Sequence, residues 1–404
     1  MTIDHAPTSA DIWIRPVPGS PSDQPGTDGS TDDREAETAA RPTRLQQLFV
    51  EQGHSPWLDG FSRGDLADGT LSRLVTDGIR GVTANPTTFT RAMEGSAEYD
   101  EQLAWLTSTA CSAEEAYGEL LAIDTIAACA ALQPVHRTSN GLDGFVSVEV
   151  APRFASNTGR TIAAARELHR RIDQTNLLVK VPATAQGVPA IKRLVAEGRS
   201  INVTLLFSLT RYDDVIEAYL SGLETYISHG GDPSRVHGFA SFFVARVDAE
   251  IDQRLQQRGA SGAGVLCGGA GIAQAKLAYQ MFNERFSGGR WERLARHGAH
   301  AQRLLWASTS PKNPADRDTR YVEELIGPQL VSTLPKRTTR AFEQHGRVTR
   351  TIDTGVQDAK EHLRSLAEAG IDMADVGSTL ETEGVSGFQR SFEQAMAVLD
   401  AKML

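Results

Sequence analysis

The sequence is poor in the features that mark several classes of protein. Only three of its 404 residues are cysteines, and Cys111, Cys129 and Cys267 follow no metal-binding or redox spacing. This pattern excludes a disulfide scaffold and fits a reducing cytoplasm. No uninterrupted apolar run reaches the roughly 18–20 residues that a membrane helix needs. The N-terminus also lacks the basic start and apolar middle of a secretory signal.

Positive charge is also in deficit. The chain has 41 lysines and arginines against 51 aspartates and glutamates, which gives a net charge of -10 at pH 7. Such a balance neither neutralises nucleic-acid phosphates nor attracts anionic lipids. We therefore expect no nucleic acid and no membrane as a partner. Hydrophobic residues make up 40% of the chain, which is ordinary for a globular protein with a large core.

The first 43 residues differ in composition from the rest. Six prolines lie among glycine, serine, aspartate and threonine, and Ile12-Trp13-Ile14 is the one apolar island. A segment with so little to bury cannot offset its ordering entropy. We expect residues 1–43 to be a disordered tail and residues 44–404 to form one domain.

From Leu45 onward, short apolar runs alternate with longer amphipathic stretches. The runs predict strands at 55–58, 81–83, 144–150, 177–181, 201–206, 236–243, 304–307 and 330–334. Helices are predicted at 69–77, 97–107, 113–131, 158–172, 187–197, 209–229 and 273–286. The strands are apolar on both faces, as in a buried parallel sheet. Eight strand–helix repeats favour a (β/α)8 barrel, with a doubly wound open sheet as the alternative.

Two further features refine the barrel prediction. The spacing doubles before the third and seventh strands, so we expect extra helices there. Near the C-terminus, Phe388, Phe392, Met396 and Leu399 recur at helical spacing. This periodicity predicts the apolar face of a helix that docks near the mouth of the barrel.

Polar residues stand at or near the ends of seven of the predicted strands. Active sites of such barrels lie at the C-terminal ends of the strands, so these side chains are expected to converge there. In chain order they are Asp59, Thr83, Asn85, Ser147, Glu149, Lys180, Asn202, Thr204, Ser241, Arg246 and Ser308.

Lys180 is the sharpest candidate, because apolar residues flank it on both sides. A buried ammonium is costly unless it is paired or neutralised. Desolvation favours the neutral amine of a lysine, and a neutral amine can attack a carbonyl. The alternative is a lysine whose long side chain reaches water from a strand end. Carboxylates at Asp59 and Glu149 favour the first interpretation, because Schiff-base chemistry needs proton donors and acceptors around the amine.

Seven segments carry a resemblance to a known family. In order, WLD (57–59), GVTANPT (81–87), VSVEV (146–150), VKVPAT (179–184) and INVTLLFS (201–208) resemble the successive motifs of transaldolases. The segments ASFFVARVD (240–248) and LWASTSPKNP (305–314) resemble the longer, actinobacterial-type branch. The resemblance covers the chain from about Leu45 to the C-terminus.

The resemblance implies a cofactor-free class I aldolase on a (β/α)8 barrel, without a metal. Lys180 would form the Schiff base with the ketose C2 carbonyl, and Asp59 would accept the proton of the C4 hydroxyl. Glu149 would act through a water held with Thr204. Thr83, Asn85, Ser147, Asn202 and Ser241 would surround the dihydroxyacetone unit, and Arg246 would bind the substrate phosphate.

The sequence departs from the family pattern in two places. Ala84 stands where many members have threonine or serine before the asparagine. The second phosphate cation is an arginine in the shorter enzymes, whereas this segment offers Ser308, Ser310 and Lys312. A lysine can bind phosphate as a point charge. Which of these side chains is the second phosphate ligand stays open from the sequence.

The predicted activity is transfer of dihydroxyacetone from sedoheptulose 7-phosphate to glyceraldehyde 3-phosphate, in the cytoplasm, by a monomer or homodimer acting on phosphorylated sugars. One alternative is a paralogue dedicated to a specialised sugar pathway. Another is an aldolase that releases free dihydroxyacetone, but such enzymes tend to have a tyrosine in place of Glu149. A third is a non-enzymatic binding barrel, which would not need Lys180, Glu149 and Asp59 together.

Overall fold

The computed structural model describes residues 41–258 and 263–403. The predicted tail therefore lies outside the described residues, apart from its last three positions. Thr43 already belongs to the folded unit, because its hydroxyl accepts a hydrogen bond from the backbone N–H of Gln46 and caps the first helix. The fold thus begins one residue earlier than the sequence indicated.

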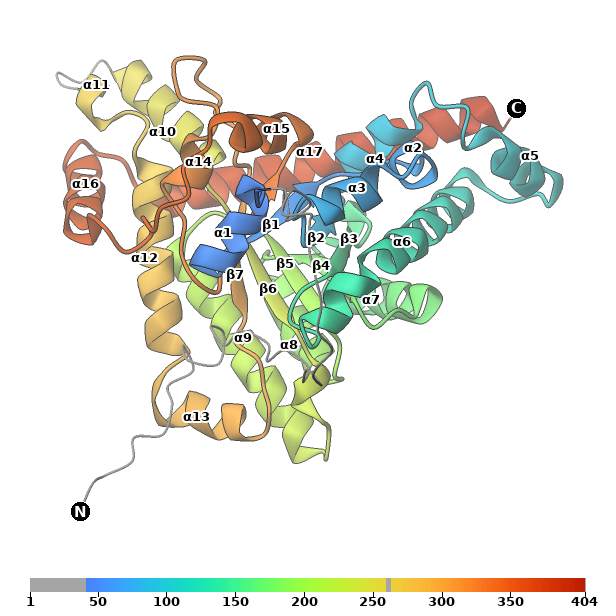
Figure 1. Ribbon diagram of the computed structural model, residues 1–404, viewed down its shortest axis with the longest axis horizontal. Coiled ribbons are helices and arrows are strands. Elements are labelled where there is room, and N and C mark those ends of the chain that lie inside the picture. Colours follow the sequence, from blue (N-terminus) through green and yellow to red (C-terminus); the bar gives the residue numbers. More distant parts are fainter. Residues whose placement is uncertain (1–40, 259–262, 404) are drawn as a thin grey trace, which may run out of the picture. The chain divides into compact units, whose positions relative to one another are not determined.

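Eight parallel strands form a closed barrel in chain order (Figure 1), and β1 pairs with β8 to close it. The strands are β1 (Ser55–Asp59), β2 (Gly81–Thr83), β3 (Phe145–Glu149), β4 (Leu177–Pro182), β5 (Ile201–Leu206), β6 (Gly238–Phe243), β7 (Arg303–Ala307) and β8 (Val331–Leu334). Each predicted strand is present, with its ends shifted by at most two residues. The barrel prediction is confirmed over the open sheet.

Helices surround the strands and fill the long connections. They are α1 (Arg44–Gln52), α2 (Arg63–Ala67), α3 (Thr70–Thr76), α4 (Pro86–Met93), α5 (Asp100–Ser108), α6 (Ala113–Thr138), α7 (Thr158–Ile172), α8 (Gly187–Val195), α9 (Leu209–Ser228), α10 (Ala245–Arg258), α11 (Ala263–Leu266), α12 (Ala270–Arg285), α13 (Gly288–Arg296), α14 (Arg320–Glu323), α15 (Lys336–His345), α16 (Val356–Glu368) and α17 (Met373–Lys402). Two short 3-10 helices are η2 (Pro152–Phe154) and η3 (Pro233–Arg235). The extra helices expected before β3 and β7 are α4 to α6 and α10 to α13.

Large side chains fill the inside of the barrel toward the N-terminal ends of the strands. The ring of Trp57 lies 4.9 Å from that of Phe239, which lies 5.4 Å from Phe145. Gly81 makes room for this layer, since a Cβ there would come within 2.4 Å of the Trp57 ring. The indole nitrogen of Trp57 donates to the buried carboxylate of Asp143 at 2.9 Å. This layer of side chains lies away from the C-terminal ends of the strands, where the active sites of such barrels are found.

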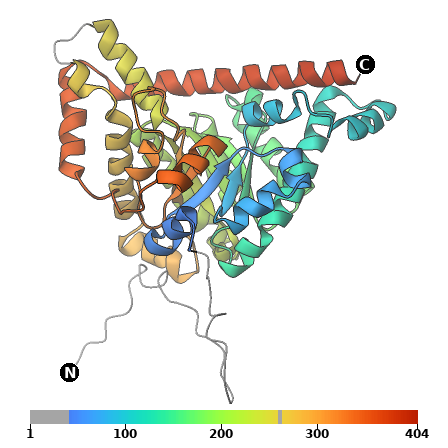
Figure 2. The same cartoon turned by 45° about the horizontal axis from the view of Figure 1, so that its top comes forward.

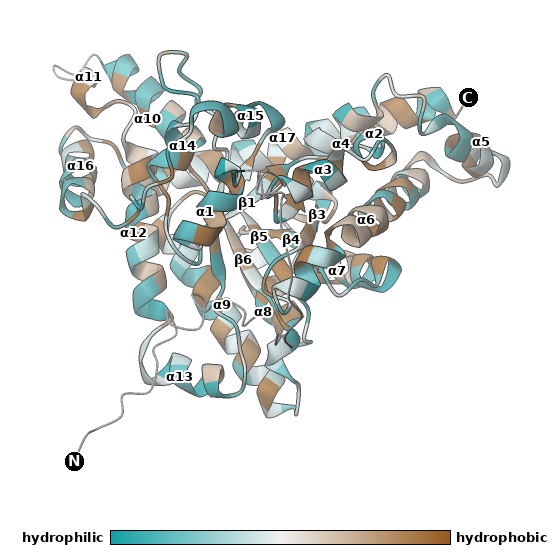
Figure 3. Cartoon of the chain, viewed as in Figure 1, coloured by the Kyte–Doolittle hydropathy of each residue, from teal (hydrophilic) through white to brown (hydrophobic). Residues whose placement is uncertain are grey.

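Within the described residues, α6 is the one helix that is long and apolar enough to cross a membrane by length and composition. It packs against β3, α2, α3, α7 and α17 of the barrel. Its Asp124 is buried and pairs with Arg63 at 2.8 Å and with the hydroxyl of Tyr99 at 2.9 Å. In Figure 3 the ribbon of α15 is coloured largely as hydrophilic, whereas that of α6 carries more hydrophobic residues. These contacts make α6 a member of the helical layer around the sheet.

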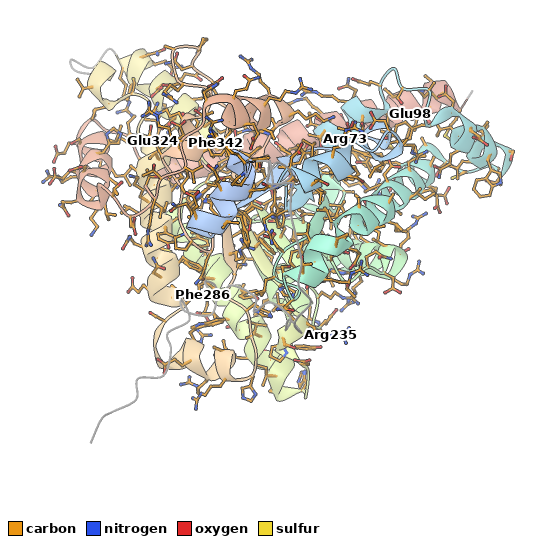
Figure 4. The ribbon with its side chains drawn as sticks, viewed as in Figure 1. Arg73, Glu98, Arg235, Phe286, Glu324 and Phe342 are labelled. Carbon is orange, nitrogen blue, oxygen red and sulfur yellow. The ribbon has the colours of Figure 1, made fainter. Side chains whose placement is uncertain are left out.

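The long helix α17 lies across the C-terminal end of the barrel (Figure 2) and confirms the predicted docking helix. Phe388, Phe392 and Leu399 are buried along one face, while Met396 is only partly buried. The hydroxyl of Ser391 contacts that of Thr87 on α4 at 2.7 Å. Other helices of the outer layer also bury aromatic side chains. One example is Phe342 of α15, which is fully buried and is labelled in Figure 4.

Candidate active site

An open pocket of about 980 Å³ lies at the C-terminal ends of the strands, where the sequence placed the site. Nine of the twelve predicted site residues line it, namely Asp59, Thr83, Asn85, Lys180, Thr204, Ser241, Arg246, Ser308 and Lys312. The other three are Glu149, Ser147 and Asn202. They lie nearby but do not line this pocket.

Lys180 projects into the pocket from β4, and its side chain is almost completely buried. Its Nζ lies 3.4 Å from Oε2 of Glu149 and 3.5 Å from the carbonyl oxygen of Ala84. Register explains the ion pair, because Glu149 of β3 and Lys180 of β4 are directly paired. A lysine whose side chain reached bulk water would be exposed, so the alternative of a solvent-facing Lys180 is wrong. The amine instead faces the pocket, where a carbonyl carbon could approach it.

Asp59 ends β1, and its partner across the sheet is Thr83 of β2. Burial raises the pKa of Asp59, while Lys180, Lys312 and a hydrogen bond from Thr83 act in the opposite direction. A carboxylate with a raised pKa is a better proton acceptor than an ordinary aspartate. Asp59 thus shares the pocket with Lys180 and has a raised pKa.

Glu149 lines a smaller cavity of about 190 Å³ next to the main pocket, together with Asn85 and Tyr117. Burial raises the pKa of Glu149, and the ammonium of Lys180 partly offsets this effect. Beyond that ion pair, Glu149 Oε2 has no hydrogen-bond partner in the described part of the chain, and neither has Oγ1 of Thr204. Both oxygens are buried, so each is available to a substrate or water oxygen near the lysine.

Asn202 and Ser147 form a buried layer beneath the pocket. The amide nitrogen of Asn202 donates to Oγ of Ser147 at 3.0 Å, and the hydroxyl of Ser241 donates to the amide oxygen of Asn202 at 2.8 Å. Both Asn202 and Ser147 are fully buried. The structure therefore connects these two residues to the pocket through Ser241.

Asn85 has a second function besides lining the pocket. Its side-chain oxygen accepts from the backbone N–H of Thr88 at 3.0 Å and so caps α4. The Thr88 hydroxyl in turn accepts from the backbone N–H of Asn85 at 3.0 Å. This reciprocal capping fixes the orientation of the Asn85 amide at the edge of both cavities.

Positive side chains gather at the outer part of the pocket. Arg246 comes from the first turn of α10, and its guanidinium lies 5.6 Å from the centre of the Phe243 ring. Lys312 comes from the loop after β7. Burial lowers the pKa of Lys312, and the neighbouring charge of Arg246 lowers it further. Both side chains line the same pocket, so an anion bound there would meet two positive charges.

Sequence reasoning missed several residues that line the pocket. These are Thr87, Thr88 and Arg91 of α4, Phe243 of β6, Thr333 of β8, and Phe388 as a lining residue. Thr333 obeys the strand-end rule and could have been found, because it lies at the end of the eighth apolar run. Arg91 lies on a helix and carries no such signal.

No group of three or more histidine, cysteine, aspartate or glutamate side chains in the described ranges could hold a metal ion. Two of the histidines, His237 and His300, stack with ring centres 4.6 Å apart. The ring of His237 also packs on Phe145, which begins β3 at the opposite end of the barrel from the pocket. The described chemistry of the pocket thus comes from carboxylates, hydroxyls, amides, a lysine and outer cations.

Comparison with known proteins decides the family. A family model described as transaldolase/fructose-6-phosphate aldolase matches residues 56–399. The chain belongs to this family. A transaldolase of Parafrankia sp. (strain EAN1pec) is 46% identical over 346 residues, covering 85% of this chain and 94% of that protein. A transaldolase of Thermobifida fusca (strain YX) is 45% identical over 354 residues, covering 87% and 96%.

A third transaldolase, from Arthrobacter sp. (strain FB24), is 44% identical over 363 residues and covers 89% of this chain and 98% of that protein. The resemblance found in the sequence is thereby confirmed, and so is transaldolase as the activity of this transferase. Neither the specialised pathway nor the dihydroxyacetone-releasing aldolase has support. The roles of individual residues stay predictions, and the geometry above is the basis for assigning them.

Proposed function

We propose that the protein transfers a dihydroxyacetone unit from sedoheptulose 7-phosphate to glyceraldehyde 3-phosphate, giving erythrose 4-phosphate and fructose 6-phosphate in the non-oxidative pentose phosphate pathway. The observation that carries the residue assignment is the burial of the Lys180 side chain at the pocket. Lys180 is nearly buried, 3.4 Å from one carboxylate oxygen of Glu149, and shares its pocket with Asp59. A covalent amine catalyst with an acid–base group on either side needs this arrangement.

The first stage is Schiff-base formation. Glu149 first takes a proton from the ammonium of Lys180, and the neutral Nζ then attacks the C2 carbonyl of the donor ketose to give a carbinolamine. Glu149, nearest to the amine, donates the proton with which the C2 hydroxyl leaves as water. Thr204, whose hydroxyl is buried in the pocket and has no described partner, holds that water in place.

The second stage is carbon–carbon cleavage. Asp59 removes the proton from the C4 hydroxyl, the C3–C4 bond breaks, and its electron pair flows into the iminium of Lys180. The aldose product leaves, and a three-carbon enamine stays on the lysine. The raised pKa of Asp59 suits this step, because the carboxylate must both accept a proton here and return it later.

The third stage reverses the first two with a new aldehyde. The enamine carbon attacks the acceptor carbonyl, and Asp59 returns its proton to the new hydroxyl. Water then adds to C2 with help from Glu149, and the product ketose leaves Lys180 unchanged. No cofactor or metal takes part in this scheme.

The outer cations would bind the phosphate of the sugars. Arg246 and Lys312 are the pair that we assign to it, since both line the same pocket, and burial and the charge of Arg246 lower the pKa of Lys312. A guanidinium and an ammonium together suit a doubly charged phosphate. Arg91 lies at the same rim and adds a third positive charge.

The proposed compartment, partners and oligomeric state follow from the composition of the chain and from the groups that the mechanism uses. All three cysteines are free thiols, which fits the reducing cytoplasm. The acidic net charge argues against nucleic acid and anionic membranes as partners. Each group used in the mechanism comes from one chain, so a monomer and a homodimer are both compatible with it. Residues 1–42 are proposed as a tail outside the catalytic domain.

An exchange assay tests the proposal. Fructose 6-phosphate and erythrose 4-phosphate should together yield sedoheptulose 7-phosphate and glyceraldehyde 3-phosphate. Fructose 6-phosphate alone should release little free dihydroxyacetone, because the enamine waits for an acceptor. Steady release of dihydroxyacetone without acceptor, at a rate similar to the exchange, would contradict the transferase assignment.

A further inference from the structure

Strand β5 breaks its regular alternation directly after Thr204. Leu205 has a φ of 58°, one of the few non-glycine residues in the described chain with a positive value. The register between β5 and β6 shifts between Val203 and Leu206 at the same place. A left-handed conformation is unfavourable for a bulky residue such as leucine. Something in the surroundings must therefore hold it.

The break changes the direction of the side chains. Val203 and Leu206 pack in the outer core between strands and helices. Thr204 faces the pocket, and Leu205 joins the apolar cluster of the barrel interior and α17. Two successive residues thus face the mouth of the barrel, which a regular strand does not allow. Regular alternation from Asn202 already turns Thr204 inward, and the irregular backbone turns the next residue, Leu205, to the same side, toward α17.

The contact that holds Leu205 comes from the far end of the sequence. Gly384 of α17 packs so closely on it that a Cβ at Gly384 would lie 2.8 Å from Cδ2 of Leu205. Hydrogen bonds fix the flanking backbone. The carbonyl of Thr204 accepts from the N–H of Ala183 at 2.8 Å, and that of Phe207 accepts from the side chain of Gln274 at 2.7 Å.

We infer that α17 positions the hydroxyl of Thr204 for the Schiff-base steps by pressing Gly384 against Leu205. Leu205 and Gly384 touch no substrate in this scheme; they are positioning residues that act through the bulge. The inference rests on the role of Thr204 in the proposed function. It gives the C-terminal helix a task in the water-handling step, in addition to covering the mouth of the barrel.

Gly384→Ala tests the inference, with Gly387→Ala as its control. Both substitutions add one methyl group to the same helix, but a Cβ at Gly387 has only the flexible end of Arg390, at 3.9 Å, within reach. Gly384→Ala should lower kcat by roughly tenfold to a hundredfold, since small misplacements of a catalytic group have effects of this size. KM for fructose 6-phosphate should stay within about twofold, and Gly387→Ala should behave as the wild type. Equal kcat values for Gly384→Ala and Gly387→Ala would overturn the inference.

A double-mutant cycle separates positioning from general damage to the fold. Thr204→Val removes the hydroxyl but keeps the shape of the side chain. In that background Gly384→Ala should cost less than about twofold, because the group it misplaces is already gone. A full additive loss would show that the contact acts by another route and would overturn the inference. If Gly384→Ala does not fold, Leu205→Gly removes the same contact and must give the same pattern.

The cycle also distinguishes this inference from the proposed function. Thr204→Val with wild-type kcat would refute the role of Thr204, and with it the positioning, although borohydride trapping at Lys180 could still succeed. Absence of trapping in the wild type would instead refute the Schiff-base proposal itself. A slow Thr204→Val combined with a normal Gly384→Ala would refute the positioning alone.

Discussion

Replacing the two carboxylates near Lys180 one at a time should stop the reaction at two different stages. Glu149 lies 3.4 Å from the amine and is therefore nearest to the nitrogen and to C2 of a bound ketose. Asp59, which ends β1 and is bonded to Thr83, acts on the C4 hydroxyl in the proposed scheme. Glu149→Gln should slow formation of the Schiff base. Asp59→Ala should form the adduct and then cleave it slowly.

The expected size of each effect follows from the type of catalysis. A positioned general acid or base contributes about a hundred- to ten-thousand-fold, which corresponds to roughly 3–5 kcal/mol of activation free energy. Glu149 belongs near the upper end, because its removal also leaves the buried ammonium of Lys180 without its ion-pair partner. Asp59→Asn serves as a control of similar shape for Asp59→Ala and should show the same stalled adduct.

Single-turnover mixing with a borohydride quench measures both effects. Reduced adducts of fructose 6-phosphate are resolved by mass into six-carbon and three-carbon forms at several times. Asp59→Ala should accumulate the six-carbon form, whereas Glu149→Gln should show a slow rise of all adducts. If both variants stall with the same adduct at the same rate, the division of labour is wrong. The assignment of the Schiff base to Lys180 would not be affected by that result.

Three further predictions concern stability, phosphate binding and the tail. Burial lowers the pKa of His54 and of His237 to about 3, so the stability they contribute is full above pH 6.5 and falls toward pH 3. Urea unfolding at pH 6 and pH 5 measures how much the free energy of unfolding falls over this unit of pH. The fall should be smaller in His54→Gln than in the wild type, by up to about 1.4 kcal/mol, and an equal fall in both proteins would contradict this. Arg246→Ala and Lys312→Ala should each raise KM for fructose 6-phosphate about tenfold or more, with little effect on dihydroxyacetone as donor; equal losses on both donors would refute a phosphate role. Removal of residues 1–40 should leave kcat and the melting temperature within error of the full chain, because the folded unit begins at Thr43, and a large loss of either would show that the tail takes part.

Much of the fold could be predicted because buried parallel strands have a simple signature. Runs such as 177–181 and 201–206 are apolar on both faces, and each is followed by an amphipathic stretch. Strand ends and the convergence of polar residues followed from that pattern together with the rule for barrels. This reasoning placed nine of the twelve predicted residues in one pocket.

Helix boundaries and loop helices were harder to predict, because tertiary contacts decide them. The prediction ended α6 at residue 131, but the helix runs to Thr138. Its last turn is fixed by His136, whose ring packs on Phe145 and whose Nδ1 lies 2.8 Å from the carbonyl oxygen of Asp143. The short helix α4 was expected only as an extra helix before β3 and without bounds, although Asn85 followed by Pro86 is a typical helix start.

Depth within the barrel could not be predicted from spacing. Asn202 and Thr204 have the same periodicity on β5, yet only Thr204 lines the pocket. Asn202 lies a layer deeper and bonds to Ser147 and Ser241. The left-handed Leu205 depends on Gly384, which is far away in sequence, so no local pattern indicates it.

The most direct test of the account is to find which lysine carries the substrate. Borohydride should reduce an adduct between the wild-type protein and fructose 6-phosphate, and mass mapping should place the added mass on Lys180 alone. Lys180→Ala should abolish both trapping and exchange while its circular dichroism and melting profile stay close to those of the wild type. A wild type that exchanges sugars without any trapped adduct, or an adduct on another lysine that persists in Lys180→Ala, would contradict the central claim.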